Sequence, residues 1–313
     1  MANVAPTVVA LALLASACGG QSSPQPAAPP PTAETPPPPA PAPRPEPIVV
    51  AGSGLAQPES VVHDVEADLY LVSNIAGKPL DKDGNGFISR IKPDGTVDEL
   101  RFIEGGKQRV ELNAPKGMAI AGDELYVADI DEVRVFDRRT GAPRRSIAVK
   151  GATFLNDVAV AADGSVYVTD SGLEQWGPYM QPNGKDAVHR IEGKRAKAIA
   201  SGKELGNPNG VLADARGLLV VNKAGELLRF DAAGNRGDVV KLPKGSLDGI
   251  VQTETALLIS SWDAKAVLAR RQDGSVEPVV DKLASPADIG YDAKRKRVLI
   301  PLLTESVLRI EAL

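Results

Sequence analysis

The sequence predicts an all-β protein, a six-bladed β-propeller that occupies residues 47–313 of the 313-residue chain. One pattern of turns and short apolar strands recurs six times along this region. Equivalent turns lie roughly 40 to 57 residues apart, which is the spacing of four-stranded propeller blades. No segment has a sustained helical period, and the strands are rich in β-branched residues.

Each repeat consists of a polar or Pro-containing turn, an apolar strand, a second turn, a second apolar strand and a strand with Arg. In the first copy PESVVHD at 58–64 precedes DLYLVSN at 68–74. The six copies begin at Pro58, Ala114, Leu155, Pro208, Leu247 and Pro286.

The sixth copy ends with the sequence and therefore lacks a fourth strand. The segment PIVVAG at 47–52 has strand composition and precedes the first copy, as EPVVDKL precedes the sixth. We expect this N-terminal strand to close the ring on the last blade, which would leave no long strand edge free.

Residues 1–17 have the pattern of a signal peptide, with an apolar stretch from Val8 to Ala17. The following Cys18 completes Ala15-Ser16-Ala17-Cys18, which resembles a bacterial lipobox, although Ala15 stands where Leu is usual and the start lacks Lys or Arg. The resemblance implies lipidation of Cys18. The alternative is a secreted protein cut after Ala17.

Residues 18–46 are dominated by Pro, Ala, Ser and Thr, a composition that predicts a disordered, extended tether of roughly 80 Å. We therefore expect an exported protein that contacts a bacterial membrane through its lipid anchor only. The residue after the cysteine is Gly19, whereas many lipoproteins that are retained at the inner membrane have Asp at this position. This favours the outer membrane and a periplasmic or surface-facing domain.

The net charge of −4 gives no excess of positive charge for binding phosphate groups, which argues against a nucleic-acid partner. A single cysteine excludes an intrachain disulfide. We expect a monomer that acts on a small molecule.

In a propeller, the turn that enters each innermost strand and the turn that leaves each second strand open on one face. Here these turns are rich in carboxylate and amide oxygens, the ligands that calcium and then magnesium prefer. Alternatively, Asn and Asp are simply good turn residues. The entering turns carry Glu59, Lys116, Asn156, Asp157, Asn209, Asp248 and Asp288, and the leaving turns carry Asn74, Asp129, Asp131, Asp170, Asn222 and Trp262.

Four segments, PESVVHDVEADLYLVSNI, FLNDVAVAADG, NPNGVLADARG and SLDGIVQ, resemble the family of senescence marker protein, gluconolactonase and luciferin-regenerating enzyme, in the same order. The resemblance implies a divalent ion, often calcium, at the channel mouth, with Glu59, Asn209 and Asp248 as ligands. It also implies that Asn156 and Asp157 contact the metal or the substrate.

Sugar-lactone members of that family have Arg at the position of Phe154, where it contacts polar substrate. Phe154 therefore implies loss of a cationic contact and a more apolar substrate. We take Phe154, Asn156, Asp170 and Trp262 as the candidate substrate contacts.

The resemblance implies metal-assisted hydrolysis of a lactone or ester, in which the cation polarises the carbonyl and Asp248, or else Asp157, activates water. Two alternatives remain open: a purely structural calcium ion, and a non-catalytic propeller of the NHL type that binds a ligand or partner protein. Propellers host all of these functions, so the fold does not decide.

Three further signals carry less weight. The segment Asp81 to Lys92 resembles half of an EF-hand loop but ends in Lys, and we interpret it as a polar turn. His63 and His189 lie in strand patterns and are expected to be structural. The insertion at 173–186, with Trp176 and Tyr179, is either a lid or a surface loop.

Overall fold

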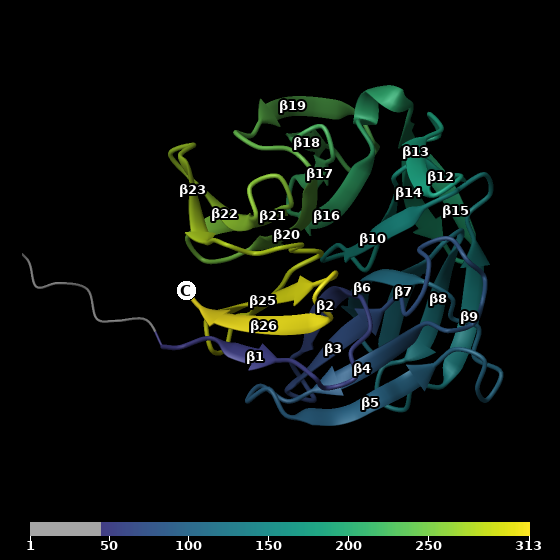
Figure 1. Ribbon diagram of the computed structural model, residues 1–313. Helices are drawn as coiled ribbons and strands as arrows, with labels where there is room; N and C mark the ends of the chain where they lie inside the picture. The colour runs from purple at the N-terminus through teal and green to yellow at the C-terminus, as the bar shows by residue number, and fades with distance from the viewer. Residues whose placement is uncertain (1–44) are drawn as a thin grey trace, which may run out of the picture. The chain divides into compact units, whose positions relative to one another are not determined.

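The computed structural model describes residues 45–313, so the predicted signal peptide, Cys18 and the predicted tether up to residue 44 lie outside the described residues. Within residues 45–313, the chain forms six four-stranded antiparallel sheets and one two-stranded hairpin. The six sheets stand as blades around a central axis (Figure 1). The predicted six-bladed propeller is confirmed.

The first five blades run in chain order from the innermost to the outermost strand. Their strands are β2 (Pro58–Asp64), β3 (Leu69–Asn74), β4 (Phe87–Ile91) and β5 (Val97–Glu104) in blade 1; β6 (Pro115–Ala121), β7 (Glu124–Asp129), β8 (Glu132–Asp137) and β9 (Pro143–Ala148) in blade 2; β10 (Leu155–Val160), β11 (Val166–Asp170), β14 (Ala187–Glu192) and β15 (Arg195–Ser201) in blade 3; β16 (Pro208–Asp214), β17 (Gly217–Asn222), β18 (Glu226–Phe230) and β19 (Arg236–Lys241) in blade 4; and β20 (Leu247–Gln252), β21 (Ala256–Ser261), β22 (Ala266–Arg271) and β23 (Val276–Val280) in blade 5.

Blade 6 joins the N-terminal strand to the last strands of the sequence. It contains β24 (Gly290–Asp292), β25 (Arg297–Leu302), β26 (Val307–Ala312) and, outermost, β1 (Ile48–Val50). β1 pairs antiparallel with β26, with Ile48 opposite Ile310 and Val50 opposite Leu308. The predicted closure of the ring by the N-terminal strand is confirmed (Figure 1).

Apolar side chains fill the spaces between neighbouring blades. Between blades 2 and 3, for example, Val133 and Ile147 pack in one cluster with Leu155 and Val168, and all four are fully buried. Burial of each such side chain stabilises the fold by about 1.5–3 kcal/mol. Because the second strand of a blade is covered on both faces, its sequence is mainly apolar, as in β17 and β25.

A β-bulge interrupts the innermost strand of each of the first five blades. The pairing of β2 with β3, for instance, shifts between Pro58 and Val61, which leaves Glu59 and Ser60 in the bulge. A bulge bends its strand and re-aims side chains, and bulges are common beside functional sites. The residue pairs in the five bulges are Glu59-Ser60, Lys116-Gly117, Asn156-Asp157, Asn209-Gly210 and Asp248-Gly249.

The second residue of each bulge lies against the neighbouring blade. A Cβ atom on Gly117 would collide with the Cα of Asp157, and one on Gly210 would collide with the carbonyl oxygen of Asp248. These close approaches require glycine. The innermost strands are therefore in contact around the axis, and the first bulge residues are held at one end of it.

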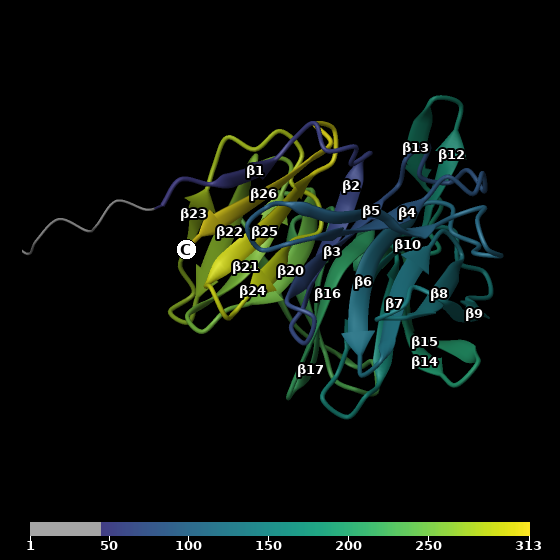
Figure 2. The ribbon, with the colours of Figure 1, turned by 90° about the horizontal axis from the view of Figure 1, so that it is seen from below.

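The 173–186 insertion forms a hairpin of β12 (Leu173–Trp176) and β13 (Tyr179–Pro182), which projects from blade 3 (Figure 2). Short loops elsewhere include the single 3-10 turn η1 (Lys203–Leu205). The segment from Asp81 is an irregular loop that leads directly into β4, so no helix follows it. Among residues 45–313 no helix is long and apolar enough to cross a membrane.

Candidate functional site

A cavity of about 510 Å³, here called the mouth pocket, opens at the end of the axis where the innermost strands begin. The first bulge residue of each of blades 1 to 5 lines it. Phe154 precedes the bulge of β10, and Trp262 follows β21; both also line the cavity. The bulge residues in the lining are Glu59, Lys116, Asn156, Asn209 and Asp248.

Three side chains of the mouth pocket each carry a buried oxygen atom with no hydrogen-bond partner in the described part of the chain. These atoms are Oε2 of Glu59, Oδ1 of Asn209 and Oδ1 of Asp248. Each residue is at most 7% exposed. An unsatisfied buried polar group costs about 1–3 kcal/mol. Three such acceptors in one cavity form a set that an electropositive ligand would satisfy.

The electrostatics of the two carboxylates agree with this. Burial, and then the negative charge of Asp248, raise the pKa of Glu59 well above its usual value, while Lys116 opposes the rise. Burial raises the pKa of Asp248 to about 6, against the hydrogen bond from Trp262 and the charge of Lys223. Both carboxylates are therefore costly to ionise together unless a cation binds between them.

Hydrogen bonds orient the other polar groups of the site. Nε1 of Trp262 donates to Oδ2 of Asp248 at 2.8 Å. The amide nitrogen of Asn209 donates to the carbonyl oxygen of Leu247 at 3.3 Å, and that of Asn156 donates to Oγ of Ser171 at 2.9 Å. These bonds use the donors and leave acceptor oxygens for a ligand.

The oxygen-rich set fits calcium. Among residues 45–313 no group of three or more His, Cys, Asp or Glu side chains is arranged as a metal site. The candidate set instead combines the two carboxylates of Glu59 and Asp248 with amide oxygens. Hard cations such as calcium accept both ligand types.

Lys116 is a pocket residue whose importance the sequence analysis missed. Its ammonium nitrogen donates to the carbonyl oxygens of Pro79 at 3.2 Å and Ala114 at 3.1 Å. It also lies 4.4 Å from the centroid of the Phe154 ring. Phe154 was expected to remove the cationic contact that an arginine makes at its position, and Lys116 places an ammonium group beside that ring. The available signal was the position of Lys116, which matches that of Glu59 and Asn156 in their repeats.

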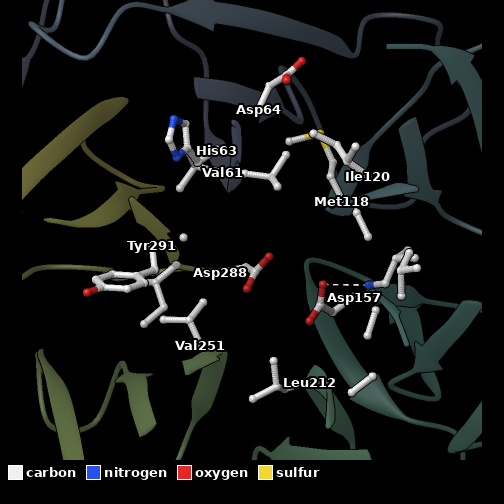
Figure 3. A pocket seen from close by; sticks show the side chains of 18 of the residues that line it. Val61, His63, Asp64, Met118, Ile120, Asp157, Leu212, Val251, Asp288 and Tyr291 are labelled. Carbon is white, nitrogen blue, oxygen red and sulfur yellow. Dashed lines mark hydrogen bonds between the residues drawn. The ribbon is translucent and has the colours of Figure 1, made fainter. Parts of the chain in front are cut away.

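Asp157 does not line the mouth pocket. Its Oδ1 accepts from the backbone N–H of Val158 at 2.6 Å, and its Oδ2 accepts from that of Val211 at 2.7 Å. It lines a second cavity, of about 550 Å³, at the other end of the inner strands, together with Asp288 (Figure 3). The reason is its second position in the bulge, where side chains leave the strand in a different direction. The structure therefore does not support Asp157 as a base in the mouth pocket.

Asp170, a predicted substrate contact, supports a loop instead. Its carboxylate accepts from the backbone N–H groups of Thr153, Phe154 and Gly172, at 3.1, 2.9 and 3.0 Å, and it does not line the mouth pocket. Asp129 acts in the same way on the backbone of Asn113 and Ala114. These acidic residues at strand ends hold the preceding loop. Of the predicted leaving-turn residues, Trp262 lines the mouth pocket.

The remaining candidates lie apart from the mouth pocket. His63 approaches Asp68 at 3.2 Å and Asp292 at 3.6 Å, and neither His63 nor His189 lines the cavity. The β12–β13 hairpin contributes no lining residue, although Asn183 near its base donates to Oγ1 of Thr153 at 2.9 Å. Trp176 is 67% exposed.

Comparisons with solved structures return other propellers. A gluconolactonase from Xanthomonas campestris superposes with a TM-score of 0.62 and 20% identity, over 82% of this chain and 86% of that one. An inactive variant of virginiamycin B lyase from Staphylococcus aureus, solved with quinupristin, gives a TM-score of 0.56 and 14% identity, over 86% and 100%. A chain of the nidogen/laminin complex gives 0.57 and 18%, over 72% and 80%.

No protein-family model matches the chain, and a search of curated proteins found no match. The three similar structures are described as a gluconolactonase, a lyase variant and a complex of nidogen with laminin, and each is at most 20% identical to this chain. The chain thus shares its propeller fold with gluconolactonases and with a streptogramin-type lyase, and the likeness establishes the fold alone.

Proposed function

We propose that this protein is a divalent-cation-dependent hydrolase of lactones or esters, with calcium as the cation and the mouth pocket as the active site. The observation that carries this proposal is the convergence of three unpaired buried oxygens, on Glu59, Asn209 and Asp248, in one cavity. The resemblance of the turn segments to gluconolactonases and the shared fold support it. Its setting would be a bacterial membrane surface, reached through lipidated Cys18.

Glu59, Asn209 and Asp248 would hold the cation, and Asn156 would contact the cation or the substrate. When bound, the cation supplies positive charge that polarises the carbonyl of the substrate and stabilises the developing oxyanion. The protein's own share is to hold these oxygens in fixed positions. The bulges of the innermost strands provide that rigidity, because their backbones pack directly against one another.

Asp248 is the residue suited to take the proton of the attacking water. Burial raises its pKa to about 6, near the pH at which a general base works best. Trp262 binds one of its oxygens, so the other oxygen is the one at which the cation and the attacking water beside it would meet the carboxylate. Asp157 is less suited to this role because it does not line the mouth pocket and each of its oxygens already accepts a backbone hydrogen bond.

The test is hydrolysis of a panel of aliphatic and sugar lactones, with calcium and with chelator, by the wild type and by Asp248→Ala. The matched control is Asp263→Ala, which removes a carboxylate that lines the same cavity and has no unpaired buried oxygen. We expect chelator-sensitive turnover that Asp248→Ala abolishes and Asp263→Ala retains. Calcium binding without any turnover would instead support a binding propeller with a structural ion.

A further inference from the structure

Two lysines line the mouth pocket without pairing to a carboxylate. Lys116 enters from the bulge of β6, and Lys223 follows β17. Neither forms a hydrogen bond or close ion pair with an Asp or Glu side chain within residues 45–313, but Lys116 interacts at longer range with the charge of Glu59, and Lys223 with that of Asp248. Lys223 is exposed at the rim of the cavity, whereas Lys116 is 1% exposed.

Lys116 is held as a fixed hydrogen-bond donor. Two of the three protons on its ammonium nitrogen are directed to the carbonyl oxygens of Pro79 and Ala114, and the ring of Phe154 packs beneath it. An ammonium group has three donors, so one remains for a ligand in the cavity. A buried ammonium is costly, and Glu59 is the carboxylate that acts on it most strongly. Because Glu59 would be taken up by the cation in the loaded site, an anionic ligand would compensate the remaining cost.

The sum of the charges in the cavity also favours an anionic ligand. Its lining contains three carboxylates, on Glu59, Asp248 and Asp263, and the two ammonium groups. A divalent cation on Glu59 and Asp248 balances those two charges. The two lysines then outnumber Asp263 and leave the loaded site net positive, and a concave site of one sign concentrates ligands of the other.

The lining also contains apolar residues, one of which, Pro79, contacts Lys116 through its carbonyl oxygen. Ile75, Pro79 and Leu303 line the cavity together with the ring of Phe154. A ligand that fits both features has an anionic group for the ammonium and an apolar body for the surrounding wall.

We infer that the mouth pocket selects an anionic substrate, an apolar lactone or ester that carries a carboxylate, and that Lys116 determines this selectivity. The lactone or ester group of this substrate rests on the proposed function. The contact between Lys116 and an anionic group does not depend on it. Phe154 then serves as the support of the ammonium as well as an apolar wall.

The test compares matched probes that differ only in charge. Hexanoate and hexanamide are titrated by calorimetry into the full-length protein, with and without calcium, for the wild type, Lys116→Met and Lys116→Arg. We expect the wild type to bind hexanoate at least tenfold more tightly than hexanamide. Lys116→Met should remove most of this preference while hexanamide binding stays the same, and Lys116→Arg should retain it.

A structural role alone would affect both probes equally. Calcium affinity gives a second readout, because removal of a positive charge beside Glu59 should leave calcium binding equal or tighter. Equal affinity for the two probes in the wild type, or a preference that survives in Lys116→Met, would overturn the inference. If Lys116→Met does not fold, Lys116→Gln, which keeps a polar side chain without the charge, replaces it, and a preference for hexanoate that survives in Lys116→Gln would likewise overturn the inference.

Hydrolysis of an aliphatic lactone with and without a carboxylate substituent separates the two proposals. Turnover of both with equal KM would overturn the anion inference and leave the hydrolase proposal in place. Hexanoate binding that depends on Lys116, with no turnover of any lactone, would overturn the hydrolase proposal and support the anion site.

Discussion

Nε1 of Trp262 donates a hydrogen bond of 2.8 Å to Oδ2 of Asp248, and Oδ1 of the same carboxylate has no partner in the described part of the protein. Both residues belong to blade 5, since Asp248 lies in the bulge of β20 and Trp262 follows β21. An indole has a single donor, so it binds one oxygen and leaves the other. The pair fixes the orientation of the carboxylate and keeps one oxygen available.

Trp262→Phe retains an aromatic ring and removes only this donor. The hydrogen bond lowers the pKa of Asp248, so its loss should raise that pKa further. Because protons compete with the cation, we expect calcium affinity to fall about tenfold at pH 6 and less at pH 8, in line with a charge-assisted bond of about 1.5–3 kcal/mol. Calorimetry at the two pH values measures this. Equal affinities for variant and wild type at pH 6 would show that the bond does not control the carboxylate.

In chelator, the protein should lose stability as the pH rises from about 4.5 to 7.5. Burial raises the pKa of Asp157 to about 7 and of Asp248 to about 6, and raises those of Glu59 and Asp288 further above the usual range. The folded state therefore binds more protons than the unfolded state in this window, and stability falls with increasing pH.

Calcium should reverse this trend. We expect the increase in Tm on addition of calcium to be about 5 °C larger at pH 7.5 than at pH 5, because the cation replaces protons that are absent at the higher pH. Differential scanning calorimetry measures both series. A calcium effect that is independent of pH, or larger at pH 5, would contradict the prediction.

Asp170→Ala should weaken the loop that carries Phe154. The substitution leaves three backbone N–H groups without their acceptor, on the buried residues Phe154 and Gly172 and on the half-buried Thr153. We expect a loss of about 2–4 kcal/mol in the free energy of unfolding, measured by urea denaturation. Calcium affinity should fall far less than in Asp248→Ala. A variant with wild-type stability but no calcium binding would place Asp170 in the site after all.

Arg138 connects the first two blades. It is 2% exposed, and its guanidinium pairs with Asp64 and Glu66 and donates to the carbonyl oxygen of Gly122 at 3.1 Å. Arg138→Met leaves the buried Asp64 uncompensated, so we expect a loss of about 3–5 kcal/mol. The neighbouring Arg139, whose side chain is 65% exposed, provides the control, and Arg139→Met should cost less than about 1 kcal/mol. If the two substitutions reduced the free energy of unfolding equally, burial of Arg138 would not explain its contribution to stability.

The hairpin of β12 and β13 offers a test of the lid hypothesis. Trp176 and Tyr179 are 67% and 72% exposed, and the hairpin does not line the mouth pocket. The double variant Trp176→Ser, Tyr179→Ser should therefore keep its Tm and its KM for lactones. A KM raised fivefold or more at unchanged Tm would show that the hairpin closes over the bound substrate.

The fold could be predicted from the sequence because every blade repeats the same apolar strands and polar turns, and because PIVVAG resembles a missing outer strand. The gathering of Glu59, Asn209 and Asp248 could also be predicted, since they occupy equivalent places in the repeats. The absence of hydrogen-bond partners for their oxygens could not be predicted, because hydrogen bonding depends on how side chains of different blades pack.

The structure gives Asp157 and Asp170 contacts that differ from those predicted, since neither lines the mouth pocket and both accept backbone hydrogen bonds. Asn156 and Asp157 are adjacent in the sequence, and no pattern reveals that a bulge sends them toward different cavities. Asp170 is an acidic residue at the end of a strand. A residue at such a position can either contact a ligand or bind the backbone of the neighbouring loop, and the sequence does not distinguish the two. The contact between Lys116 and Phe154 joins two different blades, so no pattern within a single repeat predicts it.

The pairing of β1 with β26 also constrains how the protein folds. The partners Ile48 and Ile310 lie about 260 residues apart, so closing this contact carries one of the largest loop-closure entropies available to the chain. Each of the other blades is built from neighbouring segments and can form early. Blade 6 is completed only when the last strand has been synthesised, and until then the innermost strands lack their full circle of neighbours. Assembly of the complete ring around the mouth pocket should therefore coincide with the formation of β26.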